Sequence, residues 1–538
     1  MGYADTIISG GRIFRGLHDG FAEALAIHGG RIVACGAREA VEALAGPATQ
    51  RIDLGGRLAV PAFNDSHLHL LPLGLTMGQL NLRAPEVRSL ELLLARVHAA
   101  AQSAAKGDWI VARGWDDSAL AERRPPTADE LQQAAPDNPV LAVRTCGHAA
   151  VANRAALALA GIDADTPDPE GGRIERAGGR PSGALHESAI RMVRAQIPKP
   201  SDAALVDAIE RAGQHLLTEG FAAVMDANVG MVAGTREIDA YRTAHAEQRL
   251  PVRTWICLAG NPEGIAETAW QSGIRPGQGD AMLRFGAVKV FADGSAGGRT
   301  AAVSQPYLQG GTGMFIFPHA MLHELFARYH RQGWQLAIHA IGDAAIETTL
   351  QGFEAMDTAE HPLAGRRHRI EHCEFVRPGQ IARMAARGIE AVPQMIFHHE
   401  FGDMYVQNLG RPRAEASNPM RAWIDAGMHP AAGSDAPVSA SSPFLNIHAM
   451  VTRRTAQGTL LGPEQRVSVA EAVHSYTWAS AYTQFAEDRR GRLVPGQLAD
   501  IAVLSQDIFS VAPEAIPATV TEMTLRDGRV VFDRGGRL

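Results

Sequence analysis

Two histidines close an apolar run near the amino terminus: His67 and His69 follow Leu58-Ala-Val-Pro-Ala-Phe-Asn-Asp-Ser66. If this run is a β-strand, side chains alternate across it, so residues at i and i+2 point to the same side. Two neutral imidazoles that converge at a strand end supply half of a transition-metal site. Such pairs also occur by chance on exposed strands, so this pair does not establish a metal site by itself.

Three further residues stand at the ends of apolar runs: His339, His372 and Asp435. Each has a simpler interpretation when taken alone. A single histidine after an apolar run is more often a hydrogen-bonded core residue than a metal ligand. An aspartate after Gly-Ser is usually a turn or N-cap residue. The order and position of all four sites together favour a single centre that combines imidazoles with a carboxylate.

The elements that must position these residues alternate between strands and helices. Helical patterns, such as 202–217 and 320–332, separate most of the apolar runs. Eight βα units predict an α/β fold, a (β/α)₈ TIM-like barrel, whose active site lies at the carboxyl ends of the strands. The eight predicted strands are Arg57–Asp65, Ala222–Ala227, Val252–Leu258, Arg284–Ala292, Gln335–His339, Arg367–His372, Ile389–Gln394 and His429–Ser434.

Both ends of the chain contain short alternating strands separated by glycine turns, which are typical of antiparallel hairpins. Neither end has enough strands to bury a core alone, so we expect one composite β-sandwich built from residues 1–58 and 486–538. The barrel then spans 59–485. The first two barrel strands are too far apart for a simple connection, and residues 76–200 are predicted to form an inserted α/β subdomain with a lid or substrate-recognition role.

The composition is that of an ordinary globular protein: 46% of the 538 residues are hydrophobic, 20% are charged and the net charge is −7. No cluster of basic residues suggests a nucleic-acid or membrane partner. The four cysteines contain no Cys-x-x-Cys pair, so any metal must be held by histidine and carboxylate. With no secretory leader or apolar span visible, we expect a cytoplasmic enzyme that acts on a small molecule. Homodimer formation is left open.

The ordered set of His-x-His on strand one, histidines on strands five and six, and aspartate on strand eight resembles the amidohydrolase superfamily. Further motifs resemble its YtcJ-like branch, also called amidohydrolase family 3. The resemblance extends over nearly the whole chain and implies a metal-dependent hydrolase with a barrel, a β-sandwich and a long insertion. The motifs that carry it are Asp168-Pro-Glu-Gly-Gly-Arg-Ile174, Gly183-Ala-Leu-His-Glu187, Lys289-Val-Phe-Ala-Asp-Gly-Ser295, His339-Ala-Ile-Gly-Asp343, Arg369-Ile-Glu-His372, Gly433-Ser-Asp435-Ala-Pro437 and Gly496-Gln-Leu-Ala-Asp500.

Lys289 lies in the fourth predicted strand, where an ammonium group is costly to bury. One interpretation is a lysine that extends to solvent or pairs with Asp293. The family resemblance implies another, a carboxylated lysine whose carbamate bridges two metal ions. The departure from the family pattern at Ala62 and Asn64 leaves the ligands unchanged.

The resulting hypothesis is a centre that holds Zn²⁺, one ion or two, although another divalent metal could serve. Asp435 is the expected general base as well as a ligand. The expected reaction is hydrolysis of a C–N bond in a non-peptide amide, N-formyl or cyclic amide substrate. Two alternatives are a deaminase of an aminated heterocycle and a non-catalytic binding protein on the same fold. The expected metal ligands are His67, His69, Lys289, His339, His372 and Asp435.

Six other residues are candidates for contact with substrate, although each also has a structural interpretation as a packing, turn or loop residue. Asp65 is expected to orient a ligand histidine or the strand end. The adjacent pair His398 and His399 is interpreted as mainly structural, because neighbours on a strand face opposite ways. The substrate candidates are Trp115, Asp116, His148, Glu187, Asp293 and Arg299.

Overall fold

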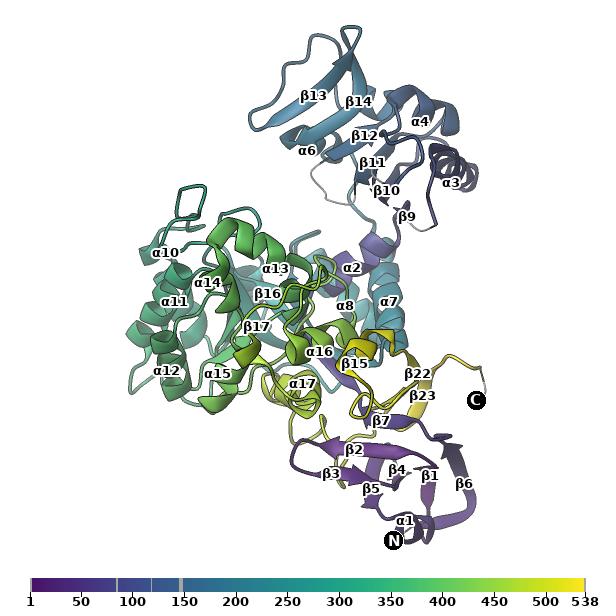
Figure 1. The fold of residues 1–538 in the computed structure, drawn as a ribbon, viewed down its shortest axis with the longest axis vertical. Coiled ribbons are helices and arrows are strands. Elements are labelled where there is room, and N and C mark those ends of the chain that lie inside the picture. The colour runs from purple at the N-terminus through teal and green to yellow at the C-terminus, as the bar shows by residue number, and fades with distance from the viewer. Residues whose placement is uncertain (1, 84–85, 118, 145–148, 537–538) are drawn as a thin grey trace. The chain divides into compact units, whose positions relative to one another are not determined.

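The structure is a computed structural model that describes residues 2–83, 86–117, 119–144 and 149–536. The chain divides into two compact units (Figure 1). One comprises Met1–Leu73 with Leu205–Leu538 and contains a barrel and a β-sandwich; the other is the insertion Gly74–Ala204. Among the described residues, no helix is long and apolar enough to cross a bilayer.

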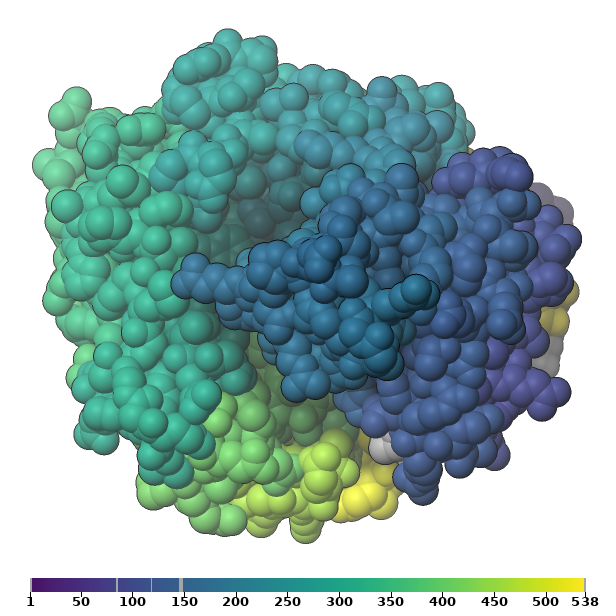
Figure 2. All heavy atoms as spheres, turned by 90° about the horizontal axis from the view of Figure 1, so that it is seen from above, coloured from purple at the N-terminus to yellow at the C-terminus, as the bar shows by residue number. Residues whose placement is uncertain are grey.

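The core of the first unit is a seven-stranded parallel sheet in the order β20-β19-β18-β17-β16-β15-β8. Its strands are almost wholly buried, as expected for parallel strands covered on both faces. In the space-filling view, the colours of this unit pass from teal through green to yellow around a ring, the order expected of consecutive βα units (Figure 2). The strands are β8 (Phe63–Leu68), β15 (Phe221–Val229), β16 (Arg253–Ala259), β17 (Leu283–Phe291), β18 (Gln335–Ala340), β19 (Arg369–His372) and β20 (Glu390–Val392).

The predicted eighth strand, His429–Ser434, is not a regular strand in the structure, but its backbone still closes the ring. The amide of Ala431 donates to the carbonyl oxygen of Ala391 in β20, and the amide of Gly433 donates to Pro393 O, just after that strand. On the other side, the Asp435 amide donates to His67 O. We call residues 429–435 the closing segment. The predicted TIM-like fold is therefore confirmed, with irregular backbone in its eighth position.

Helices follow most strands and bury one apolar stripe each. In α7, buried Leu205, Ile209, Ala212 and Leu216 recur every three or four residues. The helices of this unit are α1 (Arg38–Glu42), α2 (Leu70–Met77, which runs into the insertion), α7 (Asp202–Thr218), α8 (Arg236–Ala246), α9 (Ala266–Gln271), α10 (His319–Arg331), α11 (Asp343–Met356), α12 (Pro378–Arg387), α13 (Met395–Leu409), α14 (Arg411–Glu415), α15 (Met420–Asp425), α16 (Pro443–Thr452), α17 (Val469–His474), η2 (Ser475–Ala479) and α18 (Ser480–Tyr482), with short 3₁₀ turns at Pro463–Gln465 and Pro513–Ala518.

The β-sandwich combines strands from both ends of the chain, as predicted. One sheet has the order β5-β4-β1-β6, and the other has the order β23-β22-β21-β7-β2-β3. The predicted run Arg57–Asp65 is split, because β7 belongs to this sandwich and pairs antiparallel with β21, whereas β8 belongs to the barrel. The strands are β1 (Ala4–Ser9), β2 (Arg12–Gly16), β3 (Gly20–Ala22), β4 (Ala24–His28), β5 (Arg31–Gly36), β6 (Ala45–Asp53), β7 (Leu58–Pro61), β21 (Ile501–Leu504), β22 (Thr521–Arg526) and β23 (Arg529–Asp533).

The insertion has its own mixed sheet, in the order β13-β14-β12-β11-β10-β9, and its own hydrophobic core. Buried Leu93 and Val97 on α3 pack with strand residues such as Ala112 and Val140. A unit with a separate core can keep its structure independently of its neighbour. Its elements are β9 (Leu80–Asn81), α3 (Leu90–Ser103), β10 (Ile110–Trp115), α4 (Ala128–Ala134), β11 (Val140–Arg144), β12 (Ala149–Ala152), α5 (Arg154–Leu159), β13 (Gly172–Ala177), β14 (Arg180–Glu187) and α6 (Ser188–Arg194).

Candidate metal centre

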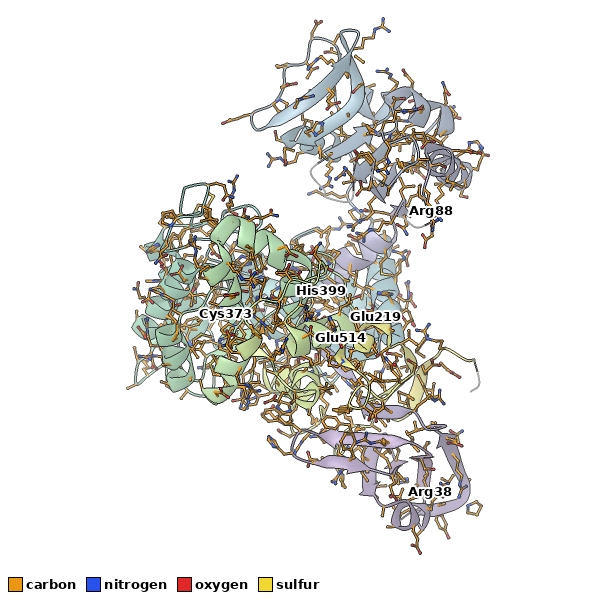
Figure 3. The ribbon with its side chains drawn as sticks, in the orientation of Figure 1. Arg38, Arg88, Glu219, Cys373, His399 and Glu514 are labelled. Carbon is orange, nitrogen blue, oxygen red and sulfur yellow. The ribbon has the colours of Figure 1, made fainter. Side chains whose placement is uncertain are left out.

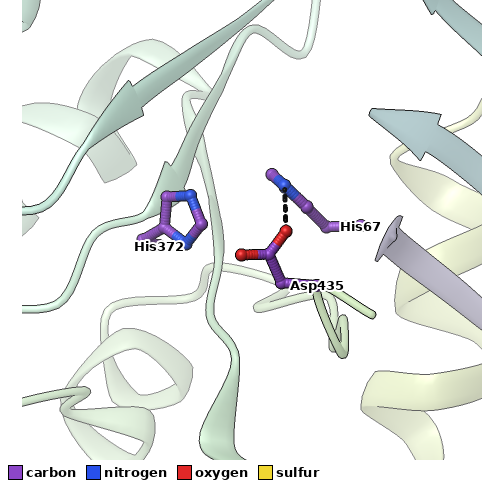
Figure 4. A group of neighbouring side chains, drawn as sticks. All are labelled: His67, His372 and Asp435. Atoms are coloured by element: carbon purple, nitrogen blue, oxygen red, sulfur yellow. Dashed lines mark ion pairs between the residues drawn. The ribbon is translucent and has the colours of Figure 1, made fainter. Parts of the chain in front are cut away.

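Three of the predicted ligands converge at the carboxyl edge of the barrel sheet. His67 comes from β8, His372 from β19 and Asp435 from the end of the closing segment. One donor atom from each lies within 4.8 Å of the others, and Figure 4 shows the His372 ring beside the Asp435 carboxylate. His67 Nε2 lies 3.3 Å from Asp435 Oδ1. Two imidazoles and a carboxylate at this spacing match the donor set of a transition-metal site.

His69 and Lys289 join this group through contacts with its members. His69 Nε2 lies 3.0 Å from the same oxygen, Asp435 Oδ1. The Nζ atom of Lys289, on β17, lies 3.2 Å from His67 Nε2. Both side chains are buried, Lys289 to 1% exposure. The buried amine therefore faces the ligand atoms and does not extend to solvent.

His339, at the end of β18, is the most peripheral of the six. Its ring centroid is 4.4 Å from that of His372. Its Nε2 donates to the carbonyl oxygen of Gly294 at 3.0 Å, which leaves Nδ1 as the nitrogen with a free lone pair. The structure thus brings all six predicted ligands into one buried cluster, with His339 turned partly toward the loop after β17.

Burial and charge act in opposite directions on these groups. Burial alone would raise the pKa of Asp435, but contacts with His67 and His69 hold it well below its usual range. Burial lowers the pKa of Lys289, and the carboxylates of Glu371 and Asp435 only partly offset this. Burial also lowers the pKa of His339, to about 3, and the nearby Lys289 acts in the same direction. The carboxylate is therefore ionised and this imidazole is neutral, the states that metal ligands require.

The backbone at this edge of the sheet adopts unusual conformations at two of the candidate ligands. His372 and Asp435 have φ values of 65° and 59°, in the left-handed region that non-glycine residues seldom adopt. Such outliers persist where the surrounding structure fixes them, often at functional sites. Gly433 lets the closing segment approach β8, since a Cβ there would lie 2.7 Å from His67 Cβ. Asp65 Oδ1 accepts from the amides of His67 and Ser434, and so ties the two segments together.

Glu371 has a clear structural role that the sequence analysis did not assign. Its Oε2 contacts His67 Nδ1, and the guanidinium of Arg369 donates to the same oxygen at 3.0 Å. Arg369 also donates to Ser66 O. Burial would raise the pKa of Glu371, but Arg369 and His67 override it and lower the pKa. A carboxylate that accepts from Nδ1–H fixes the tautomer that leaves Nε2 free for a metal.

The residues fit a divalent metal ion. The Nδ1 atom of His372 is buried and, among the described residues, has no hydrogen-bond partner. Buried polar atoms are seldom left without one. With His67 and the Asp435 carboxylate, His372 gives a donor set of the kind that binds zinc or a similar ion.

Of the two substrate candidates in the barrel unit, Asp293 lies beside this cluster, with Oδ1 3.6 Å from His339 Nε2. Asp293 is buried, and its carboxylate accepts from the amides of Ala302, Ile341 and Gly342. Burial raises its pKa to about 7 against those hydrogen bonds. Asp293 therefore holds two backbone segments, at Ala302 and at Ile341–Gly342, beside His339. Arg299 is exposed and has a φ of 55°.

The other candidates lie in the insertion. Trp115 is buried in its core and donates from Nε1 to Ala142 O at 3.0 Å. Asp116 pairs with Arg144 at 2.8 Å. Glu187 ends β14, is exposed and has a φ of 50°. His148 lies outside the described residues.

The histidine pair at 398–399 belongs to helix α13, not to a strand as the sequence analysis assumed. Buried positions at 398, 402, 405 and 409 follow a helical period. His398 Nε2 lies 3.4 Å from Arg453 O, and His399, labelled in Figure 3, has Nδ1 3.1 Å from Arg454 O. Both rings therefore contact backbone carbonyls rather than the ligand cluster.

Comparison with known proteins places this chain among hydrolases. Residues 50–532 match the amidohydrolase family. A putative amidohydrolase, YtcJ, of Bacillus subtilis is 30% identical, with 98% of this chain and 99% of that protein aligned. An N-substituted formamide deformylase of Arthrobacter pascens is 28% identical over 96% of both chains. A crystal structure of an uncharacterized metal-dependent hydrolase from Pyrococcus horikoshii superposes with a TM-score of 0.76 at 28% identity, covering 95% of this chain and 99% of that one.

Proposed function

We propose a specific hydrolytic reaction from the premise that this chain belongs to the amidohydrolase family. The reaction is cleavage of a C–N bond in a non-peptide amide, an N-formyl group or a cyclic amide, with water as the nucleophile. The observation that carries the proposal is the buried cluster of His67, His372 and Asp435 at the carboxyl edge of the barrel. That edge is where barrel enzymes place their chemistry.

His67, His69, His372 and Asp435 would hold the metal, with His339 as a further ligand. A divalent ion in such a site acts as a Lewis acid and lowers the pKa of water to about 7. Imidazole and carboxylate donors favour zinc. We leave open whether one ion or two are held.

Asp435 is proposed as the proton carrier. Its ionised carboxylate takes a proton from the attacking water, whose oxygen forms a bond to the carbonyl carbon. It then delivers that proton to the nitrogen as the C–N bond breaks, so the products are a carboxylic acid and an amine. Glu371 and Asp65 act at a distance from substrate: the first orients the His67 ring, and the second holds β8 against the closing segment.

Lys289 is proposed to carry a carbamate, whose oxygens would serve as ligands to both ions if the centre holds two. Its Nζ faces His67 Nε2 from the interior of the barrel, so a carboxyl group added there would extend among the ligand atoms. The alternative pairing with Asp293 is less well supported, because that carboxylate accepts from three backbone amides. Nothing among the described contacts gives the Lys289 amine a carboxylate partner within ion-pair distance.

The deformylase relative acts, by its name, on N-substituted formamides, and we carry this over as a candidate class. The insertion is proposed to select the substrate, with Trp115, Asp116, His148 and Glu187 as candidate contacts. Asp293 and Arg299 are the corresponding candidates in the barrel unit.

The decisive experiment combines metal analysis with a substrate screen on the purified, metal-loaded protein. The panel contains N-formyl, N-acyl and cyclic amides together with aminated heterocycles. We expect bound zinc and release of an amine from at least one amide class, abolished by chelation and restored by metal. Ammonia from heterocycles without amide cleavage would identify a deaminase instead. Ligand binding that survives chelation, with no turnover in the panel, would identify a binding protein.

A further inference from the structure

A small cavity lies at the amino-terminal edge of the barrel sheet, the edge opposite the metal ligands. It has a volume of about 30 Å³ and lies wholly within the barrel and sandwich unit. Arg253 begins β16 and Arg284 lies near the start of β17, and both line the cavity. Side chains from residues 484–490, just after α18, also line it. One water-sized particle needs roughly 10–15 Å³, so the cavity has room for a single small ion but not for an organic ligand.

Four guanidinium groups line this cavity, and only that of Arg253 has carboxylate partners. It lies 3.0 Å from Asp500 Oδ2 and 2.6 Å from Asp527 Oδ1. Among the described residues, no carboxylate lies within ion-pair distance of the other three. A charge that is partly withdrawn from water without a counter-charge is costly, so these three groups favour an added anion. They belong to Arg284, Arg489 and Arg490.

The carboxylates around the cavity do not balance the guanidinium groups. Asp280 is the one carboxylate among the lining residues. It accepts from the amides of Met282 and Leu283, and its Oδ2 lies 2.8 Å from His245 Nε2. Together with the two partners of Arg253, it makes three carboxylates for four guanidinium groups. One positive charge is left over, which a monovalent anion would match.

Arg490 is held by a neutral side chain. Its Nη2 donates to Gln484 Oε1, and Asn64 Nδ2 donates to the same oxygen at 3.2 Å. Burial lowers the pKa of Arg490 to about 9, and the charge of Arg253 acts in the same direction. The amide oxygen that holds Arg490 therefore supplies no negative charge and already receives a second donor.

Arg284 and Arg489 have N–H groups that the protein does not use. Arg284 Nε donates to Gly277 O at 3.0 Å, and among the described residues its two terminal nitrogens and the whole Arg489 guanidinium make no hydrogen bond. Neither side chain has a nitrogen that is both buried and without a partner, so these N–H groups keep surface for a ligand. Burial lowers the pKa of Arg284, and the charge of Arg489 lowers it further.

We propose that this cavity binds one small monovalent inorganic anion, with chloride as the type case. The anion accepts from terminal nitrogens of Arg284 and Arg490, and Arg489 adds a third positive charge beside it. It links the start of β17 to residues 484–490, which lead from the barrel into the β-sandwich. The site is separate from the metal centre and does not depend on the proposed reaction.

The first test is urea unfolding of the metal-loaded full chain in sodium chloride and in sodium gluconate at equal ionic strength. Gluconate is too large for the cavity and serves as the control salt. An ion that binds only the folded state stabilises it increasingly with concentration, so we expect the urea midpoint to rise with chloride but not with gluconate.

Arg284→Gln removes one of the unpaired charges and should raise the Kd for chloride, obtained from this dependence, at least tenfold. In gluconate the variant should be at least as stable as the wild type, because two neighbouring positive charges no longer repel each other. Arg413→Gln is the matched control. Arg413, on α14, also donates to backbone carbonyls but lies outside the cavity lining, so its variant should keep the wild-type chloride dependence.

A crystal of the wild-type protein soaked in bromide gives a direct measurement that does not depend on any variant. We expect one anomalous peak in the cavity, within hydrogen-bond distance of a guanidinium nitrogen of Arg284 or Arg490. Equal urea midpoints in the two salts, an unchanged chloride dependence in Arg284→Gln, loss of that dependence in Arg413→Gln, or a cavity without bromide would each overturn the proposal.

Discussion

Replacing Glu371 by glutamine tests how the metal centre is assembled. In the native site, Glu371 accepts from His67 Nδ1 while Arg369 anchors the carboxylate. Glu371→Gln keeps the size of the side chain but removes its charge and one acceptor oxygen. The amide has one acceptor oxygen where the carboxylate has two, and Arg369 loses its counter-charge in either orientation. The amide NH₂ group faces Arg369 Nε in one orientation and His67 Nδ1 in the other, and the second orientation removes the fixed tautomer of His67.

The structure gives a magnitude for each consequence. Loss of a hydrogen-bond partner behind a metal-binding histidine typically lowers metal affinity about 10–100-fold, or roughly 1.4–2.7 kcal/mol. Leaving a buried charge without its partner costs about 3–5 kcal/mol of folding stability. Arg369 is fully buried but also donates to Ser66 O, so we expect the stability loss to lie near the lower end of that range.

The assay is competition for zinc between the protein and a chelator of known affinity, with thermal unfolding measured in parallel. Glu390→Gln is the matched control. Glu390 is buried to 4% exposure on the neighbouring strand β20 and accepts from the His429 amide at 3.0 Å, away from the ligands. The reasoning would be refuted if Glu371→Gln held zinc within twofold of the wild type, or if Glu390→Gln lost as much affinity.

Three other changes have defined outcomes. Asp435→Asn should lower turnover about 10²–10⁴-fold against whichever substrate the screen identifies, and near-normal turnover would remove Asp435 from the role of base. Lys289→Ala should reduce metal per chain, with partial recovery in short-chain carboxylates; full occupancy in the variant would exclude a bridging group. His474→Gln should flatten the pH dependence of stability. In the unfolded chain His474 binds a proton below pH 6.5, whereas in the folded protein it does so only near pH 4. The wild type therefore loses about 2 kcal/mol of folding stability between pH 7.5 and pH 5. Urea midpoints that shift equally in the wild type and the variant between these pH values would contradict this.

The sequence alone predicts those features that depend on hydrophobic periodicity and on the order of residues along the chain. Helices α7 and α10 end within one residue of their predicted limits, because long amphipathic stripes are distinctive. The candidate ligands at the strand ends could be chosen because parallel strands bring their carboxyl ends to one edge, whereas Lys289 was chosen from the family resemblance. His339 and His372 could thus be assigned to one site although no local pattern joins them.

Other features depend on tertiary contacts that no local pattern encodes. The continuous apolar run does not show where β7 ends and β8 begins. The sandwich sheet and the barrel sheet both bury these side chains, so the same apolar pattern fits either sheet. The closing segment lacks regular strand geometry, yet its backbone hydrogen bonds connect β20 with β8 as those of a strand would. Glu371 did leave a signal: Arg369 and Glu371 stand at i and i+2 in a buried strand, where opposite charges on one face imply a pair.

The composite sandwich has a consequence for how the protein is made. Strand β7 pairs with β21, and Arg12 pairs with Asp507, 495 positions further along the chain. A ribosome adds about 5–20 residues per second, so β7 waits roughly 20–90 s for β21 to be translated. During that interval this edge of β7 is open to other chains. Newly made protein should therefore be most prone to aggregate just before residues 501–504 leave the ribosome, and chaperones that shield strand edges should improve its yield.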